Sequence, residues 1–173
     1  MAYVSMADAI PIREWAAENI CPHSLVHDGL ETTIHTTVLF GFMPGVDVEE
    51  VAEYCRAHFE HVDFRLGKLS RFSSCSEYDV LKVDVESEDL VELHHLLREY
   101  FGEDVSITYP DYHPHLTLAY VEKGSNPELD GHAQFEGAVF RVTELVFSTP
   151  GSKAKFRIGL LPEDAPVTPG VTG

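Results

Sequence analysis

Two segments of this chain carry the same short pattern eighty positions apart, and this repetition constrains the fold more than any other feature. The pattern is His-x-Thr, then an apolar residue, then an aromatic residue at the sixth position. The matching residues are His35, Thr37, Val38 and Phe40 in "HTTVLF", and His115, Thr117, Leu118 and Tyr120 in "HLTLAY". Residues two apart on a strand point to the same face. Each histidine must therefore point with its threonine, while apolar neighbours take the opposite face.

The rest of the chain reads as helices and strands without a dividing linker. Amphipathic spacing predicts helices at residues 11–20, 46–59 and 88–101. Alternating apolar residues predict strands at 62–72, 78–87, 113–121, 138–148 and 153–160, the last two joined as a hairpin. Residues 21–31 read as loop. In the 78–87 strand, we expect one face to be solvent-exposed and to carry Lys82, Asp84 and Glu86. We therefore predict a single α+β unit over residues 1–160 and a mobile tail at 161–173.

Composition narrows the range of partners. The chain has 29 acidic and 12 basic residues, a net charge of −17, and so has few cations for the phosphates of a long duplex. A small nucleotide or an RNA end fits this charge better. No run approaches the roughly 18 apolar residues of a membrane span, and the start lacks the features of a secretion signal. We expect a cytoplasmic monomer without a membrane partner. Its three cysteines fit neither a disulfide framework nor a thiolate metal site.

Two histidines and two threonines in one cleft suit the chemistry of a phosphodiester. In-line reaction at phosphorus needs a proton removed from the attacking oxygen and another delivered to the leaving oxygen. Imidazole titrates near neutrality, so one ring can accept a proton while the other donates one. Threonine hydroxyls can donate hydrogen bonds to the non-bridging oxygens. We therefore expect His35 and His115 to be catalytic, and Thr37 and Thr117 to bind phosphate.

The segments "HTTV" and "HLTL", with this spacing and element order, resemble the two signature motifs of the 2H (two-histidine) phosphoesterase superfamily. This superfamily includes 2′-5′ RNA ligase-like proteins and cyclic nucleotide phosphodiesterases, and the similarity is greatest to small members from bacteria and their phages. The resemblance implies a bilobed fold with pseudo-twofold symmetry, in which antiparallel sheets line a central groove and helices lie outside. It also implies cleavage of 2′,3′-cyclic phosphates, 2′-5′ linkages or cyclic oligonucleotides without metal or cofactor. A phage protein of this kind would act in the host cytoplasm. The resemblance does not assign the acid and the base.

Two alternatives remain open. His113 shares a strand face with His115, and adding His35 would give three imidazoles, enough for a metallohydrolase site. A binding module that captures a cyclic nucleotide or an RNA end without cleaving it is the other alternative. Further candidates for substrate contacts are His113 at the groove rim, Phe42, Tyr109, Tyr112 and Tyr120 for base stacking, and Lys123, Lys153 and Lys155 for phosphate.

Overall fold

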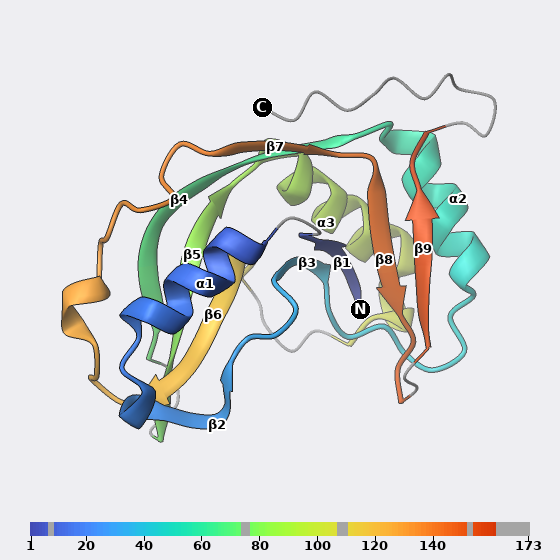
Figure 1. The fold of residues 1–173 in the computed structure, drawn as a ribbon. Helices are drawn as coiled ribbons and strands as arrows, with labels where there is room; N and C mark the ends of the chain where they lie inside the picture. Colours follow the sequence, from blue (N-terminus) through green and yellow to red (C-terminus); the bar gives the residue numbers. More distant parts are fainter. Residues whose placement is uncertain (7–8, 74–76, 107–110, 152–153, 162–173) are drawn as a thin grey trace.

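The computed structural model describes residues 1–6, 9–73, 77–106, 111–151 and 154–161 (Figure 1). The α-helices in these ranges are α1 (Ile10–Asn19), α2 (Val48–His58) and α3 (Glu88–Phe101). The strands are β1 (Ala2–Ser5), β2 (Leu25–Leu30), β3 (His35–Leu39), β4 (Val62–Phe72), β5 (Tyr78–Glu86), β6 (His115–Glu122), β7 (Val139–Val142), β8 (Glu144–Ser148) and β9 (Lys155–Gly159). The predicted tail lies outside the described residues from residue 162 onward.

The strands form one curled antiparallel sheet whose two halves meet at the repeated motifs. Along the sheet the strands follow the order β7-β4-β5-β6-β3-β1-β8-β9, and β2 adds to β6. Each repeat therefore lies on one of the two central strands, with three further strands outside it. β3 and β6 pair through Thr36 and Leu116, so a short contact joins the two halves. The predicted α+β class with antiparallel strands around a central groove is confirmed, although the halves form one continuous sheet.

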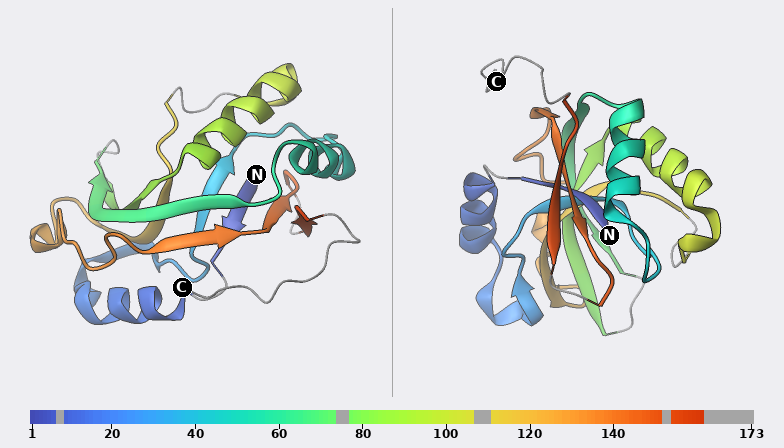
Figure 2. Two further views of the ribbon diagram at one scale, coloured as in Figure 1. Left: turned by 90° about the horizontal axis from the view of Figure 1, so that it is seen from above. Right: turned by 90° about the vertical axis from the view of Figure 1, so that its right-hand side faces the viewer.

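The helices lie on both sides of this sheet. α1 lies on one side, where it packs against β2 and β6, and α2 and α3 lie on the other (Figure 2). All three predicted helices are confirmed. Asp47 caps α2 by accepting a hydrogen bond from Glu49 N, and Ser87 caps α3 by accepting one from Leu90 N. Helix α3 ends at Gly102, which has a positive φ of 47°. None of the described helices is long and apolar enough to span a membrane.

Two short strands were absent from the sequence prediction. β1 pairs with both β3 and β8, and β2 lies within the segment predicted to be loop, where it pairs with β6. Both strands are short, and β2 contains His27 at a φ of 51° and Gly29, so neither shows a regular period of two. These two segments become strands because they form backbone hydrogen bonds with the edges of neighbouring strands. The predicted hairpin is confirmed for β8, which pairs with β9 in antiparallel register. The single strand predicted at 138–148 is wrong, because the structure divides it into β7, which pairs with β4, and β8, which pairs with β1 and β9.

The core contains the apolar residues of both central strands. Ile34, Val38, Leu116 and Leu118 are buried, as the alternation of the repeats requires. Phe42 is also buried, between Phe101 and Phe147. It belongs to this core, so the expectation that it stacks on a base is wrong. Of the thiols in the described residues, Cys55 is buried and Cys21 is exposed.

Candidate active site

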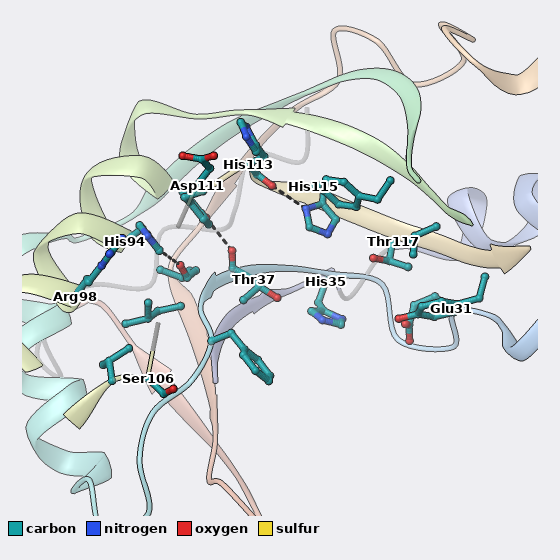
Figure 3. A pocket seen from close by; sticks show the side chains of 18 of the residues that line it. Glu31, His35, Thr37, His94, Arg98, Ser106, Asp111, His113, His115 and Thr117 are labelled. Carbon is teal, nitrogen blue, oxygen red and sulfur yellow. Dashed lines mark hydrogen bonds between the residues drawn. The ribbon is translucent and has the colours of Figure 1, made fainter. Parts of the chain in front are cut away.

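The four repeated polar residues lie together at the centre of the sheet. Because β3 and β6 are antiparallel and Thr36 faces Leu116, residue 35 lies beside 117 and residue 37 beside 115. Each histidine of one repeat is thus the neighbour of the other repeat's threonine. Figure 3 shows the rings of His35 and His115 turned toward the same space, with Thr37 and Thr117 on either side of the pair. The predicted convergence of the two repeats is present in the structure.

These residues open onto a pocket of about 630 Å³, within the size range of small-molecule sites. The pocket runs along the two central strands and is closed on one side by the end of α3 and the segments that follow it. Its lining residues are Glu31, His35, Thr37, Val38, Leu39, Phe40, Phe72, Tyr78, Val80, His94, Arg98, Val105, Ser106, Asp111, Tyr112, His113, His115, Thr117 and Tyr120. Arg98 and Ser106 lie toward one end, beyond Thr37, and Glu31 lies toward the other, beyond Thr117 (Figure 3).

Each catalytic candidate is held in the same way by its own strand. Nδ1 of His35 is 2.8 Å from the carbonyl oxygen of Thr33, and Nδ1 of His115 is 2.7 Å from that of His113. A carbonyl oxygen can only accept, so Nδ1 carries the proton in both rings. The other nitrogen, Nε2, is then the one that takes up or releases a proton. Both rings are therefore fixed in the tautomer that proton transfer requires.

An aromatic ring from another strand of the sheet contacts each imidazole. Tyr3 on β1 lies with its ring centroid 5.0 Å from that of His35, and Phe72 on β4 lies 4.9 Å from that of His115. Each histidine thus has one aromatic contact from its own half of the sheet: Tyr3 comes from the adjacent strand, and Phe72 from two strands away. Such contacts limit rotation of the imidazole, which keeps a catalytic group in a productive orientation.

An ion pair between a buried lysine and a half-exposed aspartate lies beside His115. Lys82 and Asp84 occupy β5 positions opposite Thr117 and His115, and Lys82 Nζ contacts both Asp84 Oδ1 and Ser70 Oγ. Lys82 is buried against the Phe72 ring. The prediction that Lys82 lies on a solvent-exposed face of the strand is therefore wrong. Burial lowers the pKa of His115 from its usual value, and the Lys82 charge lowers it further. The Asp84 charge raises the pKa of His115.

A buried histidine of helix α3, His94, contacts the far side of the pocket. His94 is buried, and its Nδ1 lies 2.7 Å from the Val38 carbonyl oxygen. Its ring stacks on Tyr112 with centroids 4.0 Å apart, and the Tyr112 hydroxyl donates to the Thr37 carbonyl oxygen at 2.8 Å. Burial lowers the pKa of His94 and raises that of Tyr112, so both rings are neutral near pH 7. Together they hold the backbone of β3 at Thr37 and Val38.

Some of the other residues predicted to contact substrate line the pocket, and others lie away from it. His113, Tyr112 and Tyr120 line the pocket, although one face of the Tyr112 ring is covered by His94. Lys123 lies beyond the pocket lining, where its ammonium donates to the Ser73 carbonyl oxygen and approaches Asp79. Lys155 lies on β9, away from the pocket. Tyr109 and Lys153 fall outside the described residues.

The three-histidine metal site is not supported by the arrangement of its proposed ligands. Within the described ranges, no group of three or more His, Cys, Asp or Glu side chains is placed to hold a metal ion. His35, His113 and His115 line the same pocket but do not converge as ligands of one ion.

Sequence reasoning missed several lining residues. Arg98 brings a guanidinium to the pocket from α3, one helical turn after His94, so the i, i+4 spacing of these two residues was an available signal. Phe72 and Tyr78 lie at facing ends of β4 and β5, and no local pattern separates them from ordinary strand aromatics. Glu31 comes from the segment predicted to be loop. Phe72, Tyr78 and Glu31 line the pocket because of strand pairing, and Arg98 because α3 packs beside β3.

The fold and site define an α+β protein with two histidine-threonine strands around one pocket. The model of the family described as the 2′-5′ RNA ligase superfamily matches residues 7–153, most of the chain. The chain belongs to this superfamily, which also contains the 2H phosphoesterases. A search of curated proteins found no match. Membership suggests an activity on phosphodiester bonds.

Solved structures support the same fold at low sequence identity. One is Usb1 from Kluyveromyces marxianus, with a TM-score of 0.55 and 11% identity, covering 92% of this chain and 96% of the other. Another is TT0787 from Thermus thermophilus, with a TM-score of 0.56 and 20% identity, covering 92% and 93% of the two chains. At such identities the comparison concerns the fold, and both similarities extend over nearly the whole length of each chain.

Proposed function

We propose that this protein is a metal-independent phosphodiesterase that acts on a small nucleotide or an RNA end. The observation that carries the proposal is the pair of imidazoles, each fixed through Nδ1 by the carbonyl two residues earlier, beside two threonines in one pocket. The bonds considered are a 2′,3′-cyclic phosphate, a 2′-5′ linkage or a linkage in a cyclic oligonucleotide. Capture without cleavage would not require two groups prepared for proton transfer.

In this mechanism the two Nε2 atoms divide the proton transfers. One ring, neutral, accepts the proton of the attacking hydroxyl or water as its oxygen bonds to phosphorus. The other, protonated, gives its Nε2 proton to the leaving oxygen as the opposite P–O bond breaks. The nucleophile's proton thus ends on the first ring and the leaving group's proton comes from the second. Exchange with water then restores both rings.

The threonine hydroxyls hold the non-bridging oxygens between the rings. Hydrogen bonds to a charged group are worth roughly 1.5–3 kcal/mol each, and they orient the phosphorus for in-line attack. Thr37 Oγ1 now contacts the Met1 sulfur at 3.6 Å, and sulfur is a weak acceptor. A phosphate oxygen is a much stronger one, so substrate can take over this hydroxyl.

Turnover of a defined panel tests the proposal. Purified protein is incubated in excess chelator with 2′,3′-cyclic mononucleotides, 2′-5′ and 3′-5′ dinucleotides, and cyclic di- and trinucleotides, and the products are separated by chromatography. We expect at least one class to be cleaved at an undiminished rate in chelator. Recovery of every compound unchanged, with tight binding of one, would show a capture protein instead. Activity that chelator abolishes and added metal restores would contradict the metal-independent mechanism.

Changing the ion pair beside His115 should shift the pH profile in a direction set by charge. The Lys82 charge lowers the pKa of His115 and the Asp84 charge raises it. Lys82→Met should therefore move one limb of the bell-shaped kcat/KM profile to higher pH, because it removes a cation and leaves Asp84 unneutralised. Asp84→Asn should move the same limb to lower pH. The profiles are measured against Lys68→Met, a change at an exposed β4 position.

The limb that moves identifies the role of His115. The acidic limb reports the group that must be deprotonated, so its movement would make His115 the base, and movement of the basic limb would make it the acid. Identical profiles for Lys82→Met, Asp84→Asn and the parent protein would show that His115 does not control either limb.

A further inference from the structure

The two repeats share a structural irregularity directly after their threonines. In the β1–β3 pairing, Tyr3 faces Thr37 and Ala2 faces Leu39, so Val38 is an extra residue on β3. In the β5–β6 pairing, Lys82 faces Thr117 and Leu81 faces Ala119, so Leu118 is an extra residue on β6. Val38 and Leu118 are the same position of the repeat. Each central strand thus has a β-bulge at the fourth residue of its motif.

A bulge at this position changes the face on which the following residues lie. In an unbroken strand, the sixth residue of the motif would lie on the face opposite the histidine and the threonine. The extra residue reverses the alternation, and Phe40 and Tyr120 both line the pocket together with the catalytic candidates. In both repeats, the bulge therefore brings the aromatic residue of the motif to the face that carries the proposed phosphate site.

The two aromatic residues lie at opposite ends of the pocket. β3 and β6 run antiparallel through Thr36 and Leu116, so the chain continues from each motif in opposite directions. Each aromatic residue is four positions from this pair, roughly 13 Å along an extended strand. Phe40 lies toward the Arg98 end and Tyr120 toward the Glu31 end. Phe40 is 55% exposed, so its ring is accessible to a ligand in the pocket.

We propose that Phe40 and Tyr120 each stack on one nucleoside base, so that the pocket binds a base on both sides of the scissile phosphate. This inference rests on the proposed function and names its substrate class: a phosphodiester that links two nucleosides, rather than a 2′,3′-cyclic mononucleotide. Every base has a π-face, so stacking on aromatic rings tolerates different bases. The two ends differ in charge, with Arg98 at one and Glu31 at the other, and so present different surroundings to the two nucleosides.

Removing one base at a time from the substrate tests this directly. A diadenosine phosphodiester of the cleaved linkage is compared with two analogues, each carrying an abasic ribose on one side, and with 2′,3′-cyclic AMP. We expect each abasic analogue to lose about 5- to 150-fold in kcat/KM, the effect of one base–aromatic stack. The cyclic mononucleotide should be at least as poor a substrate as the better abasic analogue.

Two variants show which base of the substrate stacks on which aromatic residue. Phe40→Ala should reduce kcat/KM for the intact dinucleotide by a similar factor and leave one abasic analogue unaffected, while Tyr120→Ala should leave the other unaffected. Phe156→Ala, at an exposed β9 position, and Tyr100→Ala, at an exposed α3 position, serve as matched controls. Tyr120→Leu replaces Tyr120→Ala if the latter does not fold.

Equal kcat/KM for the abasic and intact substrates, or a preference for 2′,3′-cyclic AMP, would overturn the two-base pocket while leaving the phosphodiesterase proposal intact. Absence of turnover of every compound would overturn both.

Discussion

Replacing either His35 or His115 by alanine should lower kcat/KM for the preferred substrate by more than about 100-fold. General acid or base catalysis typically contributes 10²- to 10⁴-fold, and each imidazole is the proposed donor or acceptor of one proton. Both rings line the pocket and are held by a carbonyl at Nδ1, which leaves Nε2 for the reaction. The measurement is steady-state turnover, supported by circular dichroism to show that each variant is folded.

The double variant should be far less impaired than the product of the two single losses, because the residues act on one transition state. His58→Ala is a suitable control, since His58 is an exposed α2 residue whose Nδ1 contacts the Tyr54 carbonyl oxygen of the same helix. Full activity of His115→Ala would contradict the proposed mechanism. A loss in His58→Ala equal to that in His35→Ala would indicate a general effect on the fold.

The central strands and the helices could be predicted because their signals are local. Asp47 and Ser87 precede amphipathic stretches and cap α2 and α3, and Gly102 ends the third helix. The period of two in each His-x-Thr segment placed the histidine and threonine on one face. The repetition itself then suggested that both segments serve one cleft. The sequence therefore predicted which residues lie at the centre of the site and that they share one face of the sheet.

The surroundings of these residues depend on pairing that no local pattern contains. The bulges at Val38 and Leu118 exist because the flanking strands β1 and β5 pair out of step with the motifs. Lys82 is buried because the face expected to be wet is covered at this position by Phe72 from β4. His94 is buried because its ring stacks on Tyr112, a residue beyond the end of α3. Each of these features reflects a contact with a distant segment.

A partly buried arginine, Arg71, joins several segments at the end of the sheet opposite the Phe40 side of the pocket, and we expect it to contribute strongly to stability. Arg71 on β4 donates to Asp79 Oδ2 at 3.0 Å, to Asp130 Oδ1 at 2.8 Å and to the carbonyl oxygens of Ser125 and Asn126. Asp79 is 1% exposed and also accepts from Gly124 N at 2.8 Å. One guanidinium thus joins β4, β5 and the segment that follows β6.

Arg71→Met should lower the free energy of unfolding by about 3–5 kcal/mol near neutral pH, because it removes the guanidinium that hydrogen-bonds the buried Asp79 carboxylate. A second cation, Lys123, remains near Asp79, with its Nζ 3.9 Å from Asp79 Oδ1. In the parent protein, burial alone would raise the pKa of Asp79, but hydrogen bonds from Gly124 N and Arg71 outweigh burial and hold it below its usual value. Asp79 therefore stabilises the parent above the unfolded pKa of about 4, and this contribution is lost as pH falls through the lower folded pKa. In the variant, burial should raise that pKa.

The difference between parent and variant should accordingly be largest at neutral pH and shrink as pH falls toward about 4, where a buried Asp79 can be protonated. Urea unfolding at several pH values measures this trend. Arg65→Met is the matched control, since Arg65 lies on the same strand but its pair with Glu86 is exposed, and such pairs contribute little. A loss of stability in Arg71→Met no greater than in Arg65→Met, or one independent of pH, would show that the Arg71 network does not hold this end of the sheet together.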